Sequence, residues 1–308
     1  MNSELHTKSA QAKQLVIKGW GSSPLPWLLP LGIILLFVFL YPIFEIIKFS
    51  FTNASLLETD LSYTLGSYMS LFSLPGFYQM LTITAIFVLF SVVFQLFFGF
   101  LIAAAIDQGQ KLKLKGTVIV RTAVLTAWAI PGVVIGIIWR IMYNETNAGI
   151  LNHFVSVLGL NTISFLSDPN AALFSVILAN VWRGTAFSMI LIYAAIQTLP
   201  SDVMEAAKID GANALQRLMK VILPMLAPII LITLIIISID TFNTFDMVMA
   251  LTGGGPGQST EVIALSIYTV IFREFNLGQG AATAVVLLAI NILMTLVYLK
   301  VIGRKGEQ

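Results

Sequence analysis

One long apolar stretch of the chain carries polar and aromatic side chains at helical spacing. They are an amide, a guanidinium, a glycine and a phenyl ring at positions i, i+3, i+4 and i+7, namely Asn180, Arg183, Gly184 and Phe187. In a helix these four positions share one face. The amide and the guanidinium can hydrogen-bond hydroxyl groups, the ring can stack on a sugar, and glycine leaves room beside them. This face is therefore a candidate pathway for a sugar-like solute.

The charge of Arg183 restricts where that face can lie. A charged side chain in the middle of a membrane is costly unless it faces a pore, a water-filled cavity or a partner. A later apolar stretch carries Asp240, Asn243 and Asp246, which are spaced by three residues. Two interpretations stay open, because Arg183 can face the solute or can pair with Asp240 as a structural bridge. Asn243 and Asp246 are further candidates for the pathway.

A polar segment between two apolar stretches has the pattern of two short helices. Residues 199–224 read LPSDVMEAAKIDGANALQRLMKVILP. Ser201 or Asp202 can cap the first helix, and Gly211 can end it because glycine readily adopts a left-handed backbone. A second short helix then leads to the next apolar stretch. The apolar side of such a pair can insert into a groove on another protein or lie on lipid head groups.

The rest of the composition excludes several kinds of chemistry. The chain has no cysteine, and its two histidines, His6 and His153, have no carboxylate at metal-ligand spacing. We therefore expect no disulfide, no metal site and no histidine-dependent catalysis. No G-x-x-x-x-G-K-[ST] motif is present, which predicts that the chain does not bind ATP itself.

Hydropathy predicts an all-α membrane protein. Hydrophobic residues make up 57% of the 308 residues and charged residues 10%, so lipid is the natural solvent for this chain. Pro131 and Pro228 are expected to kink or end helices, and Gly132 with Gly136 forms a small-residue face suited to close packing. Six apolar stretches are each long enough to span a bilayer, at about residues 27–51, 80–106, 117–141, 171–198, 221–250 and 280–302.

The lysines and arginines predict the orientation of these spans. They gather in the N-terminal tail, in the loops after the second and fourth spans, and at the C-terminus. Since positive loops stay cytoplasmic, both termini are predicted to be cytoplasmic, which requires an even number of spans. The first span is too long for the apolar part of a cleavable signal peptide. The predicted organisation is a polar cytoplasmic tail (1–24), a six-span domain (25–303) with a cytoplasmic loop at 200–224, and a cytoplasmic end (304–308).

The cytoplasmic loop resembles the signature loop of ABC importer permeases. That signature is Glu-Ala-Ala, three residues, Gly, nine residues, an aliphatic residue, any residue and Leu-Pro. The aliphatic position is Val221 here, where the family more often has isoleucine. The triplet Asp210-Gly211-Ala212 resembles the carbohydrate-uptake branch, and the resemblance extends from about Pro30 to Ile302. The residues that match are Glu205, Ala206, Ala207, Gly211, Val221, Leu223 and Pro224.

This resemblance implies a transmembrane domain of a type I ABC importer, of the larger-permease type related to the maltose and glycerol-3-phosphate systems. The chain would be a non-catalytic permease subunit of a sugar importer in a bacterial or archaeal cytoplasmic membrane. Its implied partners are a second, homologous permease, two ATPase subunits that hold ATP and magnesium, and an extracytoplasmic solute-binding protein. The residues implied to couple to the ATPase subunits are Glu205, Ala206, Ala207, Asp210, Gly211, Leu223 and Pro224.

The resemblance also bears on the solute pathway. Asn180, Gly184 and Asn243 match a maltose-system relative near its sugar, whereas Arg183 and Phe187 differ in type. The sequence leaves the sugar open, and a glycerol phosphate or a polyol is an alternative solute. A gradient-driven secondary transporter using Asp240 or Asp246 is a further alternative, which would leave the Glu-Ala-Ala loop without a role.

Overall fold

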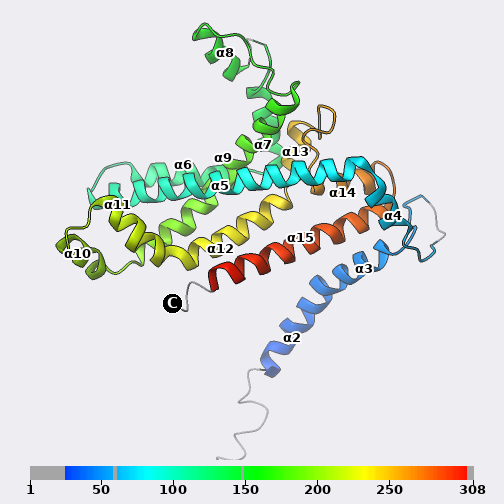
Figure 1. The fold of residues 1–308 in the computed structure, drawn as a ribbon, viewed down its shortest axis with the longest axis horizontal. Helices are drawn as coiled ribbons and strands as arrows, with labels where there is room; N and C mark the ends of the chain where they lie inside the picture. Colours follow the sequence, from blue (N-terminus) through cyan, green and yellow to red (C-terminus); the bar gives the residue numbers. More distant parts are fainter. Residues whose placement is uncertain (1–24, 58–60, 147–148, 304–308) are drawn as a thin grey trace, which may run out of the picture.

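The computed structural model describes residues 25–57, 61–146 and 149–303, and these residues form helices without a β-strand (Figure 1). One isolated antiparallel bridge pairs Thr52 with Tyr63. The predicted tail 1–24 and end 304–308 lie outside the described residues. The all-α prediction is confirmed for the part of the chain that the structure describes.

Within the described ranges, five helices are long and apolar enough to cross a membrane, and a bent pair supplies a sixth span if it is counted as one. The five are α2–η2–α3 (Leu25–Leu35, Leu36–Leu40, Tyr41–Ser50), α5 (Pro75–Lys111), α9 (Pro169–Gln197), α11–η3–α12 (Ala214–Arg217, Leu218–Ile222, Leu223–Phe242) and α15 (Leu277–Gly303). Shorter helices are α4 (Gly66–Ser73), α8 (Ile150–Val157), α10 (Ser201–Ile209) and α14 (Ile263–Phe272). We call the end that carries α10 the inner end and the end that carries α4 and α14 the outer end, following the predicted orientation (Figure 1).

The third predicted span is not straight. It consists of α6 (Thr117–Ala129) and α7 (Gly132–Met142), which meet at an angle of 104°. Pro131 lies at the bend, and the residue before it, Ile130, is extended with ψ 131°. A proline disfavours helical geometry in the residue that precedes it, so the helix ends there. The third predicted span is therefore a bent pair of helices, and the kink or end expected at Pro131 is confirmed.

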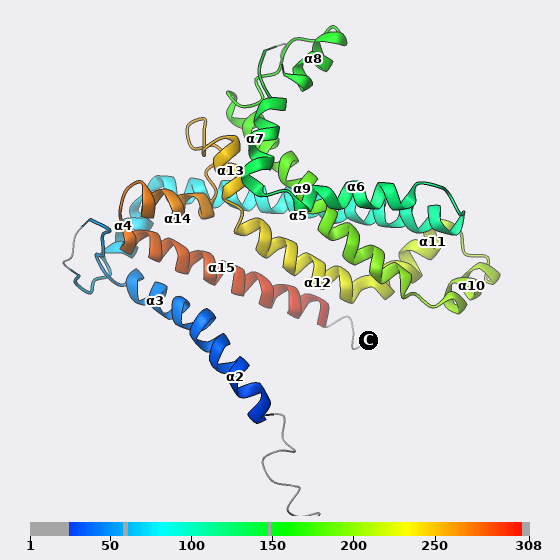
Figure 2. The ribbon, with the colours of Figure 1, turned by 180° about the vertical axis from the view of Figure 1, so that it is seen from behind.

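The fifth predicted span is shorter than expected. Helix α12 ends at Phe242, and a separate helix α13 (Asp246–Leu251) follows, instead of one helix reaching Ala250. Helix α13 packs on α7 beside the first break (Figure 2). A Cβ atom on Gly136 would lie 2.6 Å from the Met247 carbonyl oxygen, so glycine permits this close approach. Pro228, in contrast, stays inside α12 without interrupting it.

Two π-helical turns each lead directly into a proline. η2 (Leu36–Leu40) precedes Tyr41-Pro42, and η3 (Leu218–Ile222) precedes Leu223-Pro224. A proline lacks an N–H and its ring clashes with the carbonyl four residues earlier, and a wider turn relieves both problems. Because η3 joins α11 to α12, the second short helix predicted after Gly211 is the start of the fifth span instead of a separate helix.

Helices α5 and α9 form the most extensive helix pair of the core and run in the same direction (Figure 2). A Cβ atom on Gly99 of α5 would lie 2.5 Å from Cβ of Ser188 and 2.9 Å from the backbone nitrogen of Met189. The Gln95 amide nitrogen donates a hydrogen bond to the carbonyl of Asn180 at 3.2 Å. Small residues and buried amides hold helices together where lipid removes the hydrophobic driving force between them.

A Gly99→Val substitution should therefore destabilise the folded protein. The new side chain meets the α9 backbone, and overpacking of this kind costs about 1–3 kcal/mol. Gly32→Val is the matched control, because nothing lies within 4 Å of a Cβ atom at Gly32 of α2. Thermal unfolding of the purified protein in mild detergent would show the difference, and equal melting temperatures for the two variants would contradict the packing described.

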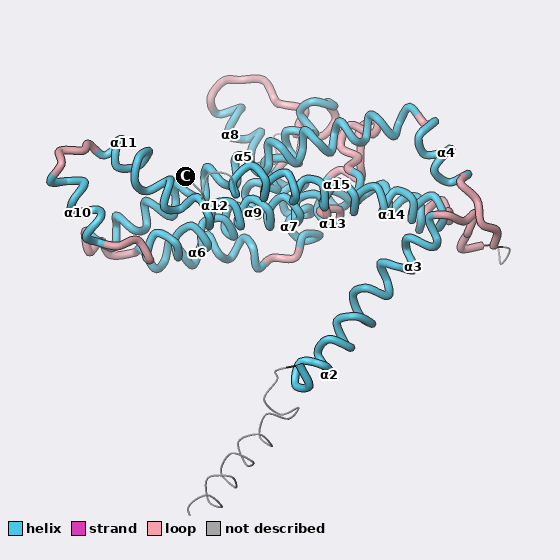
Figure 3. The backbone as a smooth tube through the Cα atoms, turned by 60° about the horizontal axis from the view of Figure 1, so that its bottom comes forward, coloured by secondary structure: helices cyan, strands magenta, loops and turns pink. Residues whose placement is uncertain are grey.

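The first span departs from the rest of the bundle. Figure 3 shows α2 pointing away from the other helices, while α3 contacts α15 near the outer end. The 18-residue apolar window of this span has no buried residue, and Trp27 is 79% exposed. A helix that exposes apolar side chains on all sides is suited to lipid or to another membrane helix.

The outer loop between α7 and α9 is held by one carboxylate. Glu145 accepts hydrogen bonds from the backbone nitrogens of Leu166 (2.9 Å) and Ser167 (2.7 Å) and from the Ser167 hydroxyl (2.8 Å). Burial alone would raise the pKa of Glu145, but these hydrogen bonds outweigh it and lower the pKa. These hydrogen bonds therefore hold Leu166 and Ser167, just before α9, against Glu145, just after α7.

Candidate coupling loop and solute pathway

Helix α10 begins directly after a proline. Pro200 is the N-cap residue and provides no side-chain cap. Ser201 is the first helical residue, and its hydroxyl donates to the Asp202 carboxylate at 3.2 Å. The prediction that Ser201 or Asp202 caps this helix was wrong, because both residues lie inside the helix and Pro200 occupies the N-cap position.

Gly211 ends α10 in a left-handed conformation with φ +76°. Its N–H donates to the Lys208 carbonyl at 3.1 Å, and the N–H of Ala212 donates to the Ala207 carbonyl at 3.0 Å. This pair of hydrogen bonds is a Schellman motif, which satisfies the last carbonyls of a helix. On the far side of the bend, Asn213 and Gln216 form a reciprocal capping box with two bonds of 2.9 Å. The bend between α10 and α11 is thus fixed from both sides.

The α10 surface is open to solvent in this chain. Glu205, Ala206 and Asp210 are exposed, and Ile209 is 86% exposed. The helix lies beyond the inner ends of α9 and α12 (Figure 1). Leu223 and Pro224 lie apart from it, in the first turn of α12. The candidate coupling residues therefore lie in two places. One group is on exposed α10 and its bend, and the other is at the start of α12.

The predicted pathway residues of α9 contact three different neighbours. Asn180 is 1% exposed, and a Cβ atom on Gly184 would overlap the carboxamide of Gln95, so both positions face α5. Phe187 packs on Trp128 of α6 with ring centroids 5.7 Å apart. The four residues lie on the same helix, but in this conformation their side chains do not line a common cavity. The sequence analysis missed Gln95, a lone amide in an apolar run.

Arg183 faces α12 instead. One of its terminal nitrogens lies 3.9 Å from the Asp240 carboxylate, with side chains that are 19% and 54% exposed. The Nε atom of Arg183 is buried and has no hydrogen-bond partner among the described residues. This distance agrees with the structural-bridge interpretation, while the unused Nε atom leaves Arg183 with capacity for another partner.

Asp246 lies where the two broken spans meet. Its carboxylate packs directly against Gly132, the first residue of α7, where any side chain would collide with it. One carboxylate oxygen accepts from the backbone nitrogen of Met247 at 2.8 Å. Breaks in membrane helices free backbone groups and are tolerated where they line a cavity or are buried in protein. The sequence analysis did not find this contact, because residues 132 and 246 are far apart in the chain.

Asn243 lies in the break between α12 and α13. Its amide nitrogen donates to the Ile239 carbonyl at 2.7 Å. It lines an open, mostly apolar pocket of about 620 Å³ between α12, α14 and α15, together with Asn291 and Thr295. The amide oxygen of Asn291 is buried without a hydrogen-bond partner among the described residues. Asn243 and Asp246 are therefore close in sequence but face different surroundings.

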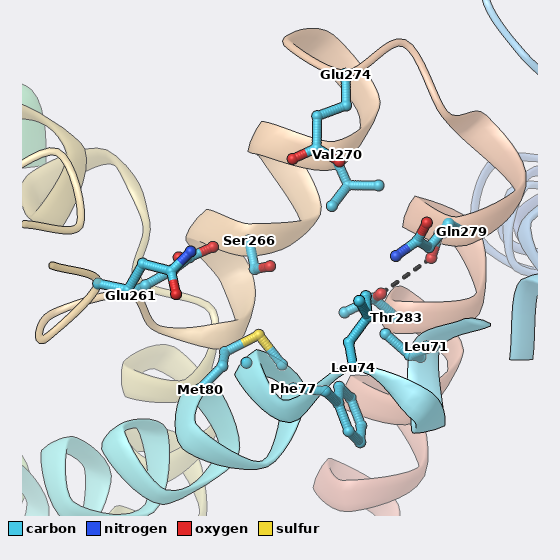
Figure 4. A pocket seen from close by; sticks show the side chains of 12 residues that line it. Leu71, Leu74, Phe77, Met80, Glu261, Ser266, Val270, Glu274, Gln279 and Thr283 are labelled. Carbon is cyan, nitrogen blue, oxygen red and sulfur yellow. Dashed lines mark hydrogen bonds between the residues drawn. The ribbon is translucent and has the colours of Figure 1, made fainter. Parts of the chain in front are cut away.

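A second pocket opens at the outer end, between α4, α5, α14 and α15. The pocket has a volume of about 330 Å³. The carboxylates of Glu261 and Glu274 and the Ser266 hydroxyl lie around it (Figure 4). On the opposite wall the Thr283 hydroxyl donates to the Gln279 carbonyl at 2.9 Å. No spacing in the sequence predicted this outer pocket, because its lining comes from four separate segments.

The chain is similar in sequence to known permease proteins and in structure to a solved ABC transporter. The chain is 34% identical over 240 residues to the trehalose/maltose transport system permease protein MalF of Thermococcus litoralis, covering 77% of this chain and 78% of that protein. It is 31% identical to the sulfoquinovosyl glycerol transport system permease protein SmoG of Agrobacterium fabrum, covering 90% and 89%. A crystal structure of a bacterial ABC transporter that imports alginate superposes with a TM-score of 0.77 at 21% identity, covering 96% of this chain and 98% of that chain.

The family described as the binding-protein-dependent transport system inner membrane component matches residues 108–305, which is more than half of the chain. This match includes the bent third span, α9, the α10 loop and the two last spans. It confirms the resemblance found in the residues around Glu205 and Gly211, and it agrees with a multi-pass chain of apolar helices. The chain belongs to the family of binding-protein-dependent transport system inner membrane components.

Proposed function

We propose that this chain is one permease subunit of an ATP-driven importer for a carbohydrate. The observation that carries the proposal is its membership of the binding-protein-dependent family together with its 34% identity to a trehalose/maltose permease. The relative named for sulfoquinovosyl glycerol supports the same solute class. A glycerol phosphate or a polyol is the alternative solute, since such molecules share the hydroxyl groups that amide and guanidinium side chains bind.

The proposed assembly contains four further proteins. A second, homologous permease completes the pore, two ATPase subunits hold ATP and magnesium, and a solute-binding protein delivers the solute from outside. This chain then binds no cofactor and catalyses no reaction. The exposure of α10 at the inner end supports a docking site for an ATPase subunit there.

Movement of α10 is the proposed link between ATP hydrolysis and transport. Closure of the ATPase dimer displaces α10, and the fixed bend at Gly211 passes that displacement to α11 and α12. The spans then rock between an inward-open and an outward-open arrangement. Glu205, Ala206, Ala207 and Asp210 contact the ATPase subunit, while Leu223 and Pro224 begin the span that receives the movement.

The solute is proposed to pass the two helix breaks. The α6–α7 bend and the α12–α13 break meet at Gly132 and Asp246, and broken helices in transporters often supply solute-binding groups. Arg183 and Asp246 provide polar groups on this path, and Asn243 is proposed to join them when the spans move, since in this conformation it faces the pocket between α12, α14 and α15. Asn180, Gly184 and Phe187 support it through their packing in this conformation, and become accessible if α9 moves relative to α5.

Uptake into proteoliposomes tests the proposal. The companion binding protein is first screened against sugars, polyols and glycerol phosphates by thermal shift, and the solute it binds is then offered to the reconstituted complex. We expect accumulation that requires ATP, the binding protein and this chain. Uptake by the isolated chain, driven by an ion gradient without ATPase subunits, would instead establish the secondary transporter.

A further inference from the structure

The inner ends of α5 and α9 are joined by a buried carboxylate. Asp107 of α5 is 5% exposed, although it is an acidic residue near the end of an apolar helix. One of its oxygens accepts a hydrogen bond from the side-chain nitrogen of Gln197 at 2.9 Å, and the other accepts from Lys111 at 2.6 Å. A buried carboxylate is retained only where hydrogen bonds compensate for its lost hydration. The contact with Gln197 crosses from α5 to α9, whereas Lys111 belongs to α5 itself.

A second hydrogen bond joins the same two helices one turn away. The Tyr193 hydroxyl donates to the side-chain oxygen of Gln110 at 2.7 Å. The guanidinium of Arg121, from α6, lies 5.8 Å from the centroid of the Tyr193 ring, which is a cation–π geometry. We call Asp107, Gln110, Tyr193 and Gln197 the inner knot. None of these residues was a candidate in the sequence analysis.

The inner knot is close to α10 along the chain. Gln197 is the last residue of α9, and three residues, 198–200, separate it from α10. The backbone nitrogen of Thr198 donates to the Ala195 carbonyl at 3.1 Å, and that of Leu199 donates to the Ile196 carbonyl at 3.2 Å. Two of the three connecting residues are therefore hydrogen-bonded to the last turn of α9. Because this connection is short and partly hydrogen-bonded to α9, a displacement of α10 should also move the last turn of α9.

Helix α5 extends from the inner knot to the outer pocket. It has 37 residues, which corresponds to a length of about 55 Å. Phe77 and Met80, near its other end, line the pocket that contains Glu261 and Glu274. The tight contacts of Gln95 and Gly99 with α9 keep the two helices together along the way.

We propose that the inner knot passes the displacement of α10 from α9 into α5, and so links the α10 loop to the outer pocket. Asp107 and Gln197 are positioning residues in this proposal, which rests on the proposed importer function. If the inner knot only stabilises the fold, its removal should lower assembly of the complex and every activity together. If the inner knot transmits movement, its removal should leave assembly and basal ATPase activity intact. Uptake and the stimulation of ATPase activity by the loaded binding protein should then fall.

The test uses the full complex in proteoliposomes and measures basal ATPase activity, ATPase activity stimulated by the loaded binding protein, and solute uptake. Asp107→Ala and Gln197→Ala should each lower uptake and stimulated activity about tenfold. The double variant should be no worse than either single one, because both remove the same contact. Asp107→Asn keeps an oxygen that can accept from Gln197 and should restore most of the activity.

Lys111→Ala is the matched control, because it removes a partner of Asp107 that does not reach α9. We expect this variant to lose some stability, because Asp107 keeps fewer partners, but to retain the unmodified uptake and stimulated ATPase activity per assembled complex. Three results would contradict the transmission role of the inner knot without affecting the proposed function. They are a loss of uptake in the double variant equal to the product of the two single losses, a loss of uptake and stimulated activity in Lys111→Ala as large as in Asp107→Ala, and unmodified uptake in both Asp107→Ala and Gln197→Ala. Absence of ATP-dependent uptake in the unmodified complex would overturn the proposed function, and the transmission role with it.

Discussion

The Gly211→Pro variant is expected to lose solute uptake almost completely while the protein remains folded in the membrane. Gly211 has φ +76° and donates its N–H to Lys208, whereas proline fixes φ near −65° and has no N–H. The Schellman bend after α10 therefore cannot form, and α10 is no longer held at a fixed angle to α11. We expect uptake to fall by about a hundredfold.

Matched substitutions separate backbone geometry from side-chain size. Nothing lies within 4 Å of a Cβ atom at Gly211, so a small side chain meets no clash. Asparagine tolerates the left-handed conformation, and Gly211→Asn should retain most of the uptake, with Gly211→Ala intermediate. Uptake by the proline variant at the unmodified rate, measured with equal amounts of protein in the membrane, would contradict the role of the bend.

The Glu205→Lys variant is expected to lose its ATPase partner. Glu205 is exposed in the middle of α10, where its carboxylate can meet a positive group on another protein. Reversal of its charge places like charges together, and we expect uptake to fall by about tenfold or more. Glu205→Gln, which keeps the size and removes the charge, should show a smaller loss.

Co-purification in mild detergent reports on this interaction directly. We expect the ATPase subunit to be recovered with the unmodified chain in low and moderate salt, and to be depleted with Glu205→Lys. Because the proposed contact is between exposed charges, high salt should screen it and lower the recovery of the ATPase subunit with the unmodified chain. Equal recovery of the ATPase subunit with both chains would mean that Glu205 does not orient the docking.

Features that depend on neighbouring residues were predictable from the sequence. The end of α10 at Gly211 follows from glycine in a left-handed conformation, and the end of α6 follows from the effect of Pro131 on the residue before it. The long apolar helices follow from hydropathy alone. The π turns before Pro42 and Pro224 have the same local origin, although the sequence analysis did not draw that conclusion.

Features that depend on which helices become neighbours could not be predicted. The spacing of Asn180 and Gly184 places them on one face of α9, but it does not say that Gln95 fills the space beside them. The contact between Gly132 and Asp246 and the end of α12 at Phe242 depend on two breaks meeting in the folded chain. Buried polar residues such as Gln95 and Asp107 were the missed signal, since each is rare in an apolar helix.

Cysteine cross-linking from α10 tests the central claim most directly, since the chain has no cysteine of its own. A cysteine introduced by Ala206→Cys is exposed on α10, and one introduced by Phe272→Cys, at a side chain 57% exposed, lies at the outer end. With a short bifunctional thiol reagent and ATPase subunits carrying surface cysteines, Ala206→Cys should yield a cross-link to the ATPase subunit and Phe272→Cys should not. Cross-linking from the outer position, or none from α10 in complexes that transport, would contradict the account.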